Sequence, residues 1–198
     1  MATNLDGPGV AEGIRARNPQ VIQAVIRTYL PQVRRAARGA GLAPDQADDV
    51  VQETFTTFVE TAPRFQGRSH VRTWLFGILY RKIAERRRHL DREQRMDDVD
   101  DVIESRFDVA GSWSQPPRPA DSALLDREVR KQIEKCLDTC TTRYRMAFLL
   151  REVEGLSTRE ICEILDVTAT NLGVMLYRVR NRLRECLEAE GAWGKTRR

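Results

Sequence analysis

The sequence predicts an all-α protein made of two small helical domains. Apolar residues recur at steps of three and four residues over residues 20–92 and again over residues 121–190, which is the period of helices with one buried face. Between these segments, residues 93–120 carry an acidic run and a Pro-rich stretch with no sustained period, as is typical of a flexible linker. Residues 1–19 are expected to form a flexible tail, and residues 191–198 a basic tail.

The composition argues against a membrane protein and against a metal-binding or disulfide-rich protein. The chain has 198 residues and a net charge of +4, and no apolar run approaches the roughly 18 residues that span a membrane. Without a signal pattern at the N-terminus, we expect a cytoplasmic protein that does not contact a membrane. The four cysteines show no paired spacing and no nearby histidine, so we expect no metal, no cofactor and no disulfide framework. They are interpreted as small buried or half-buried residues (Cys136, Cys140, Cys162 and Cys186).

The N-terminal domain is expected to contain three helices, over about residues 20–38, 45–61 and 69–90, around one apolar interior. Trp74 lies on the apolar stripe of the third helix, which favours core packing over stacking on a base. The third helix also carries a strong positive charge along its length, from Arg68, Arg72, Arg81, Lys82, Arg86, Arg87 and Arg88.

The second of these helices has a compact acidic and amide face, made by Asp48, Asp49, Gln52 and Glu53. Acidic residues near a helix N-terminus interact favourably with the helix dipole. This effect explains the first two residues better than the last two. The face is therefore also a candidate surface for binding another protein.

The C-terminal domain ends in a predicted helix-turn-helix. Ser157 and Glu160 have the spacing of a capping box at the start of a short helix, and residues 166–168 break that helix. A longer helix follows, with one apolar stripe of Leu172, Leu176, Val179, Leu183 and Leu187. Because its other faces are polar and cationic, we expect it to lie in the major groove of DNA. The alternative is an ordinary helical hairpin with a solvated basic face.

Three segments of the chain resemble two conserved regions of bacterial RNA polymerase sigma factors. The second conserved region of that family is resembled by DDVVQETF (residues 48–55) and RFQGRSHVRTWLFGILYRKIAERRR (residues 64–88). The fourth region is resembled by LREVEGLSTREICEILDVTATNLGVMLYRVRNRLRECLE (residues 150–188). With no third domain between them, this is the layout of the extracytoplasmic-function (ECF) group. The resemblance covers roughly residues 20–92 and 121–188.

The resemblance implies a transcription initiation factor of the kind used in stress responses. Such a factor binds core RNA polymerase through the coiled coil of the largest subunit and the flap of the second-largest subunit. It recognises the −35 and −10 elements of promoter DNA and promotes strand opening, and an anti-sigma factor commonly masks it.

Two other function classes account for only part of the sequence. A stand-alone helix-turn-helix transcriptional regulator is the alternative, but it needs neither the acidic face nor the tryptophan-bearing basic helix. An enzyme, such as a nuclease built on Asp48, Asp49 and Glu53, lacks a supporting His or Lys constellation. We therefore expect no catalytic activity.

The resemblance also implies site residues. Polymerase contacts fall on Asp48, Asp49, Gln52, Glu53 and Phe55, and −10 contacts on Arg68, Arg72, Arg81, Lys82, Arg86, Arg87 and Arg88. The −35 contacts fall on Thr170, Asn171, Gly173, Val174, Tyr177 and Arg178.

The −35 segment departs from many family members, which carry basic or hydroxyl residues where this chain has Gly173, Val174 and Met175. Asn171 is then a candidate for reading adenine, Val174 for a thymine methyl group, and Arg178 for a base or a phosphate. The acidic linker is either a solvated tether or, as the family implies, a segment that threads the RNA exit channel of the polymerase.

Overall fold

The computed structural model describes residue 5, residues 7–93 and residues 125–189, and the predicted linker and C-terminal tail lie almost entirely outside these residues. Within the described part all regular structure is helical, as predicted. The helices are α1 (Pro8–Arg15), α2 (Pro19–Gly39), α3 (Pro44–Thr61), η1 (Ala62–Arg64), α4 (Val71–Glu93), α5 (Leu125–Leu137), α6 (Thr142–Phe148), the π-helix η3 (Leu149–Val153), α7 (Thr158–Leu165) and α8 (Ala169–Ala189). None of these helices is long and apolar enough to cross a bilayer.

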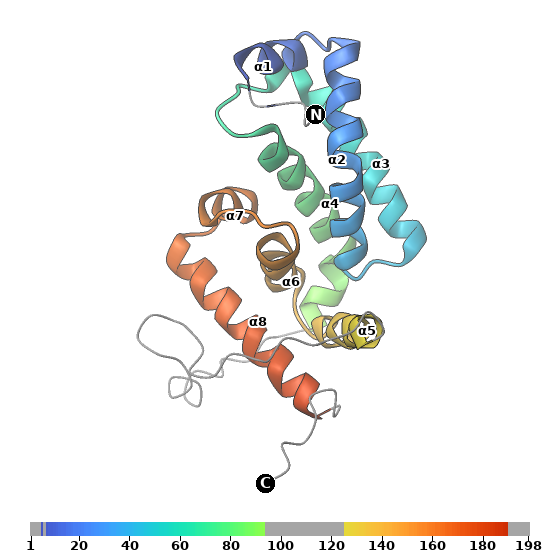
Figure 1. Cartoon of the computed structure of the whole chain (residues 1–198), viewed down its shortest axis with the longest axis vertical. Helices are drawn as coiled ribbons and strands as arrows, with labels where there is room; N and C mark the ends of the chain where they lie inside the picture. Colours follow the sequence, from blue (N-terminus) through green and yellow to red (C-terminus); the bar gives the residue numbers. More distant parts are fainter. Residues whose placement is uncertain (1–4, 6, 94–124, 190–198) are drawn as a thin grey trace.

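Helices α1 to α4 form what we call the N-terminal bundle (Figure 1). Helix α2 begins at an Asn18 cap, whose side-chain oxygen accepts hydrogen bonds from the backbone nitrogens of Gln20 and Val21. The predicted apolar stripes of α2, α3 and α4 face one interior, where Val25, Val33, Val50, Phe58, Leu75 and Ile83 are fully buried. The helical period in the sequence therefore located this core correctly.

The segment before residue 19 differs from the expected tail. Residues 8–15 form helix α1, in which Pro8 occupies the first turn and Ile14 is fully buried against the bundle. Leu5 is also buried. A helix this short is marginal by itself and is stabilised by tertiary packing, which a search for long apolar stripes does not detect.

Helices α5 to α8 form what we call the C-terminal unit. Helix α8 packs against α5, α6 and α7, and its predicted stripe from Leu172 to Leu187 is buried. The α5 side of this unit has a small apolar cluster of its own, made with the second half of α8.

The cysteine expectation requires a correction. Cys136 of α5 and Cys186 of α8 form a disulfide with a sulfur–sulfur distance of 2.02 Å. Cys140 is a free thiol in the same apolar cluster, and burial raises its pKa, which makes it less reactive. The two bonded residues are 50 positions apart, so that sequence spacing gave no sign of the pair.

The C-terminal end of α2 is held by arginines from both halves of the chain. Arg87 of α4 donates to the carbonyl oxygen of Ala40 at 2.5 Å, and Arg145 of α6 donates to that of Gly39 at 2.6 Å. The last carbonyls of a helix carry partial negative charge, so cations are stabilising there. Both arginine side chains are buried. The turn between them requires Gly41, whose φ is +76°.

We expect the Gly41→Ala variant to be less stable by about 1–3 kcal/mol, because a left-handed backbone is strained for alanine. The new methyl group would also meet the guanidinium groups of Arg87 and Arg145. Thermal unfolding measures the difference. Gly77→Ala is the matched control, since its methyl group meets no atom within 4 Å and alanine favours the helix by up to about 1 kcal/mol. Equal loss of stability in both variants would contradict this account.

Candidate nucleic-acid interface

Helix α7 and the turn that follows it are held by side chains at the two ends of α7. Ser157 caps α7 through the predicted capping box, in which the Ser157 amide donates to Glu160 at 2.9 Å. Helix α7 ends at Asp166, whose φ is +53°. Arg143 of α6 donates to the carbonyl oxygens of Leu165 and Asp166, each at 2.9 Å. The predicted helix-turn-helix is therefore present, and hydrogen bonds hold both ends of α7.

The first turns of α8 form the exposed end of this motif. Thr168 caps the helix by accepting a hydrogen bond from the Asn171 amide at 3.2 Å. The predicted residues Thr170, Asn171, Gly173 and Val174 are exposed, and 43% of the Val174 surface is open to solvent. N-terminal residues of a recognition helix are the ones that contact base edges. Met175, in contrast, is buried and cannot belong to a reading face.

The polar residues further along α8 make contacts within the protein. Tyr177 and Arg178 are half-buried, and Arg178 donates to the Tyr144 hydroxyl at 3.3 Å. Arg180 pairs with Glu152 at 2.6 Å, and Arg182 donates to Thr139 at 3.1 Å. The cationic face that the sequence suggested is thus used largely to hold α8 in place.

The predicted basic residues of α4 and the preceding loop separate into two groups. Arg68, Arg81 and Arg88 are exposed. Four others have partners in the protein: Arg72 with Glu160, Lys82 with Glu53, Arg86 with Asp49 and Glu53, and Arg87 with the Ala40 carbonyl. Arg87 is buried and follows Ile83 by four residues, a spacing that indicates the inner face of the helix.

The acidic face of α3 is also tied into ion pairs. Asp48 accepts two hydrogen bonds from Arg34 of α2, at 3.1 and 3.2 Å, and Glu53 pairs with Arg86 of α4. Phe55 is buried in the core. Asp49 keeps 63% of its side chain exposed, and Gln52 is exposed as well. These two residues line a shallow hollow together with Glu53, Thr56, Thr57, Glu60 and Lys82.

The predicted acidic and amide face does not include three of the residues that line this hollow, Thr56, Thr57 and Glu60. They follow the acidic face at steps of three and four residues along α3, which is the signal that would have found them. Among the described residues, no group of three or more His, Cys, Asp or Glu side chains is placed to hold a metal ion.

Two protein-family models match this chain. Sigma-70 region 2 matches residues 25–93, and Sigma-70 region 4 matches residues 130–183. The chain belongs to the sigma-70 family of RNA polymerase sigma factors. The N-terminal bundle contains region 2 and the C-terminal unit contains region 4.

Similar proteins identify the ECF type of sigma factor. A probable RNA polymerase sigma factor of Haemophilus influenzae is 32% identical over 151 residues, which cover 72% of this chain and 77% of the relative. The ECF RNA polymerase sigma-E factor of Escherichia coli K12 is 28% identical over 135 residues, covering 68% of this chain and 70% of the relative. The protein is therefore an ECF sigma factor, a transcription initiation factor that binds core RNA polymerase and promoter DNA.

Two solved structures have similar folds. The sigma factor RpoE, in complex with the anti-sigma factor NepR from Bartonella quintana, has a TM-score of 0.60 and 26% identity, covering 83% of this chain and 95% of that one. CnrH, in complex with the cytosolic domain of CnrY, has a TM-score of 0.66 and 19% identity, covering 91% of this chain and 96% of that one. The second likeness shows the fold alone.

In this sigma factor Trp74 is half-buried and packs against the core of region 2, as predicted. Its ring stacks on Phe65 with centroids 4.8 Å apart and lies edge-on to Phe58 at 5.3 Å. Such aromatic pairs stabilise a core by more than the burial of their apolar surface alone. Trp74 therefore joins the start of the loop before α4 to the core through Phe65.

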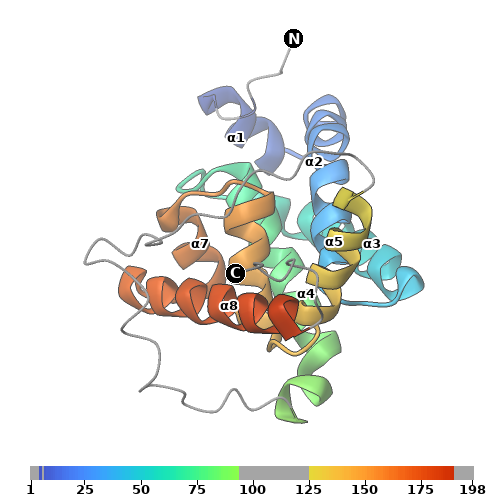
Figure 2. The same cartoon turned by 60° about the horizontal axis from the view of Figure 1, so that its bottom comes forward.

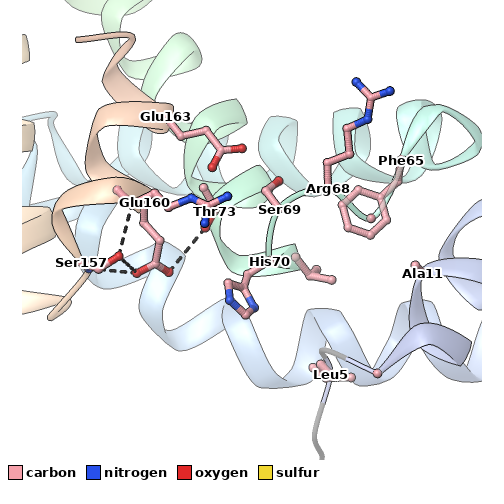
Figure 3. A pocket seen from close by; sticks show the side chains of 14 residues that line it. Leu5, Ala11, Phe65, Arg68, Ser69, His70, Thr73, Ser157, Glu160 and Glu163 are labelled. Carbon is pink, nitrogen blue, oxygen red and sulfur yellow. Dashed lines mark hydrogen bonds between the residues drawn. The ribbon is translucent and has the colours of Figure 1, made fainter. Parts of the chain in front are cut away.

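A cavity of about 330 Å³ lies where this region 2 loop meets region 4 (Figure 3). The loop contributes Phe65, Arg68, Ser69 and His70, and α7 contributes Glu160 and Glu163. Burial alone would raise the pKa of Glu160, but hydrogen bonds from Ser157 and Arg72 and the charge of Arg72 lower it to about 2. Glu160 is therefore ionised at neutral pH and holds Arg72 at 3.0 Å.

Proposed function

We propose that this ECF sigma factor reads the −35 element through the exposed start of α8. The observation that carries the proposal is the exposure of four residues at the start of a helix whose preceding turn is held by Arg143: Thr170, Asn171, Gly173 and Val174. An asparagine can pair with adenine through two hydrogen bonds, and an apolar side chain can contact the methyl group of thymine. Arg178 supports the position of α8 by donating a hydrogen bond to the Tyr144 hydroxyl of α6.

We expect Asn171→Ala to relax sequence choice at one or two −35 positions, because a paired amide contributes about 1–3 kcal/mol of discrimination. Selection of −35 sequences from a randomised library, by holoenzyme containing each variant, measures the change. Glu185→Ala is the control, since Glu185 is exposed on the same helix but far from its start. If Asn171→Ala selects the same −35 sequence as the wild type, and as strictly, then the DNA-reading face lies elsewhere on the protein.

For the −10 element, we propose that Arg68, Arg81 and Arg88 contact the DNA strand directly. Their exposure supports this role, because arginine forks bind phosphate and stack on unpaired bases. Arg72, Lys82, Arg86 and Arg87 instead hold α4 in place through their ion pairs and hydrogen bonds.

We expect the double variant Arg81→Ala with Arg88→Ala to bind core polymerase normally but to open duplex promoter DNA about tenfold less well, since one phosphate or stacking contact contributes roughly 1 kcal/mol or more. Permanganate footprinting detects the open bases. A template already unpaired at the −10 element should recover part of the loss. If the double variant gives the same footprints as the wild type on duplex DNA, these two arginines do not contact the −10 element.

For polymerase binding, we propose that the hollow on α3 around Asp49 and Gln52 meets the coiled coil of the largest subunit, and that region 4 meets the flap of the second-largest subunit. The exposed carboxylate of Asp49 supports the first contact. Asp48 and Glu53 position this surface through Arg34 and Arg86. Phe55 supports it from within the core.

We also propose that the protein works in the cytoplasm, where core polymerase and promoter DNA are found, and that it has no catalytic activity of its own. An anti-sigma factor is a further partner. Two similar folds, CnrH and RpoE, were solved in complex with CnrY and with the anti-sigma factor NepR, which supports this partner class. We propose in addition that the acidic linker threads the RNA exit channel of the polymerase.

A further inference from the structure

The recognition helix α8 carries two adjacent residues that weaken a helix, Gly173 and Val174. Glycine is the poorest helix former apart from proline, and the branched side chain of valine loses rotational freedom in a helix. Exposed helix positions, where packing does not decide the residue, are best filled by strong helix formers. Both residues are exposed, and the helix of 21 residues begins at Ala169, before either of them. The pair therefore departs from local helix preference.

Within the described residues, nothing requires a glycine at position 173. A methyl group added there would meet no atom of another part of the chain within 4 Å. The φ of Gly173 also lies outside the left-handed region, unlike the positive φ of Gly41, Gly67 and Gly155. Neither packing nor backbone conformation therefore explains this glycine. A local preference that is broken without compensation inside the protein indicates a functional position.

Three exposed residues near the start of α8 share one face of the helix. Thr170, Gly173 and Val174 are three and four residues apart, which places them together, and we call them the uncharged face. On the other side of the helix, Leu172 and Leu176 are buried in the core. The first turns of α8 lie beside α7 and its last turns beside α5 (Figures 1 and 2). The uncharged face is therefore at the end of the helix away from α5.

The chemistry of the uncharged face favours thymine. In the major groove thymine presents a 5-methyl group, whereas guanine presents two acceptors that arginine or lysine binds best. The methyl groups of Thr170 and Val174 can make apolar contact with the thymine methyl group, and 43% of the Val174 surface is open. None of the three residues of this face carries a charge that could bind guanine. Further along the helix, Arg180 is paired with Glu152.

A glycine beside Val174 determines how closely a base pair can approach the helix backbone. An apolar contact requires heavy atoms within about 4.0–4.5 Å of one another. Valine is a short side chain, so that Val174 reaches a thymine methyl group only if the backbone of α8 lies deep in the groove. A β-carbon at Gly173 would extend roughly 1.5 Å from the backbone, the length of one carbon–carbon bond. Glycine is the residue that permits a close approach of backbone to a ligand.

We propose that Gly173 and Val174 form a thymine-reading pair. Val174 contacts the 5-methyl group of a thymine in the −35 element, and Gly173 allows the backbone of α8 to come close enough for this contact. The inference rests on the proposed function, since it names the base that the start of α8 reads. Gly173 is a positioning residue, because it acts through Val174. The helix stability that is lost at this pair is offset only in the complex with DNA.

Exchange of thymine for uracil tests the contact on the wild-type protein. The exchange removes the 5-methyl group and leaves the hydrogen-bonding groups of the base unchanged. The probe is duplex promoter DNA with the −35 sequence that wild-type holoenzyme selects from a randomised library, in which each −35 thymine is replaced in turn. We expect one replacement to weaken binding of holoenzyme about fourfold, the effect of one methyl group withdrawn from an apolar contact.

Two substitutions should abolish this preference for thymine over uracil. Val174→Ala removes the apolar contact, and Gly173→Ala holds the helix away from the base pairs. Gly173→Ala should also weaken binding to the thymine promoter about tenfold, as much as a mismatched base pair does. It should raise the melting temperature of the protein by about 2–4 °C, since alanine is the better helix former. A purely structural role for Gly173 would instead move affinity and stability in the same direction.

Each variant has a matched control elsewhere in the chain. Gly77→Ala also adds a methyl group that meets no atom within 4 Å, but at a buried position of α4. Val153 of η3 matches Val174, because it is a valine of similar exposure, 46% against 43%. Gly77→Ala and Val153→Ala should both keep the wild-type preference for thymine.

Several results would overturn the thymine-reading pair. One is a selected −35 sequence without thymine, or one in which no uracil replacement weakens wild-type binding. Another is a Val174→Ala or Gly173→Ala variant that keeps the wild-type preference. A lower melting temperature of Gly173→Ala would show that the glycine does not weaken the helix. If wild-type holoenzyme selects no −35 sequence at all, the proposed function fails as well, whereas a selected sequence without dependence on the methyl group refutes the thymine-reading pair alone.

Discussion

The Asp49→Arg variant is expected to weaken assembly with core RNA polymerase by about thirtyfold or more. Reversing a charge that is desolvated at an interface costs about 2–5 kcal/mol, and 1.4 kcal/mol corresponds to a factor of ten. Asp49 is chosen because 63% of its side chain is open and its ion pair with Arg86 is long, at 3.7 Å, so that most of the effect arises at the interface. A binding titration of labelled sigma factor with core polymerase measures the change.

Asp45→Arg is the matched control for this prediction. Asp45 is exposed in the first turn of the same helix, and its reversal changes the net charge by the same amount. It should lower helix stability by less than about 1 kcal/mol and leave polymerase affinity near wild type. Equal weakening by both variants would indicate a general charge effect, and no weakening by Asp49→Arg would exclude the α3 hollow as the docking surface.

Loss of the Cys136–Cys186 disulfide is expected to lower the stability of region 4 by about 2–4 kcal/mol. The reason is that a cross-link between residues 50 positions apart restricts the unfolded chain. It also ties α5 to the far end of the recognition helix α8. Thermal unfolding of the wild type with and without a thiol reductant, and of Cys186→Ser, measures the difference.

The control for the disulfide is Cys162→Ser, because Cys162 is a half-exposed free thiol on α7. Its stability should fall on addition of reductant by as much as that of the wild type. Cys186→Ser, in contrast, should respond little to reductant. Identical unfolding of the oxidised and reduced wild type would show that the bond does not stabilise region 4.

The parts of the fold that follow from local sequence were predicted correctly. The stripe from Leu172 to Leu187 and the box of Ser157 and Glu160 depend on residues three or four apart, which a helix brings together whatever surrounds it. The helix-turn-helix could therefore be placed before its structure was known. Its exposed first turn follows from the same stripe.

The remaining features depend on contacts between distant residues. Arg87 and Arg145 are both buried at the end of α2, beside Gly41. The spacing of Arg87 from Ile83 indicates an inner face, but the carbonyl groups that these two arginines bind are far away in the sequence. Cys136 meets Cys186 only because α5 packs along α8. Helix α1 is held by burial of Ile14 rather than by its own propensity.

The same limit applies to the candidate site. The sequence analysis predicts that the charged residues of α3 and α4 bind polymerase and DNA. In the structure, four of them lie in ion pairs that join helices: Asp48, Glu53, Lys82 and Arg86. An opposite charge on a neighbouring helix cannot be read from one helix alone. Arg68, Arg81 and Asn171 are exposed, and Asp49 keeps 63% of its side chain open despite its 3.7 Å ion pair with Arg86, so these four residues are accessible to partners.

The most direct test of the sigma factor account is run-off transcription with core polymerase on a promoter library randomised at both elements. The account predicts transcripts only when this protein is added. It also predicts that the selected templates share both a −35 and a −10 sequence at a fixed spacing. Transcripts that are independent of the protein would contradict it. So would selection of a −35-like sequence alone without binding to core polymerase, which is the behaviour of a stand-alone regulator.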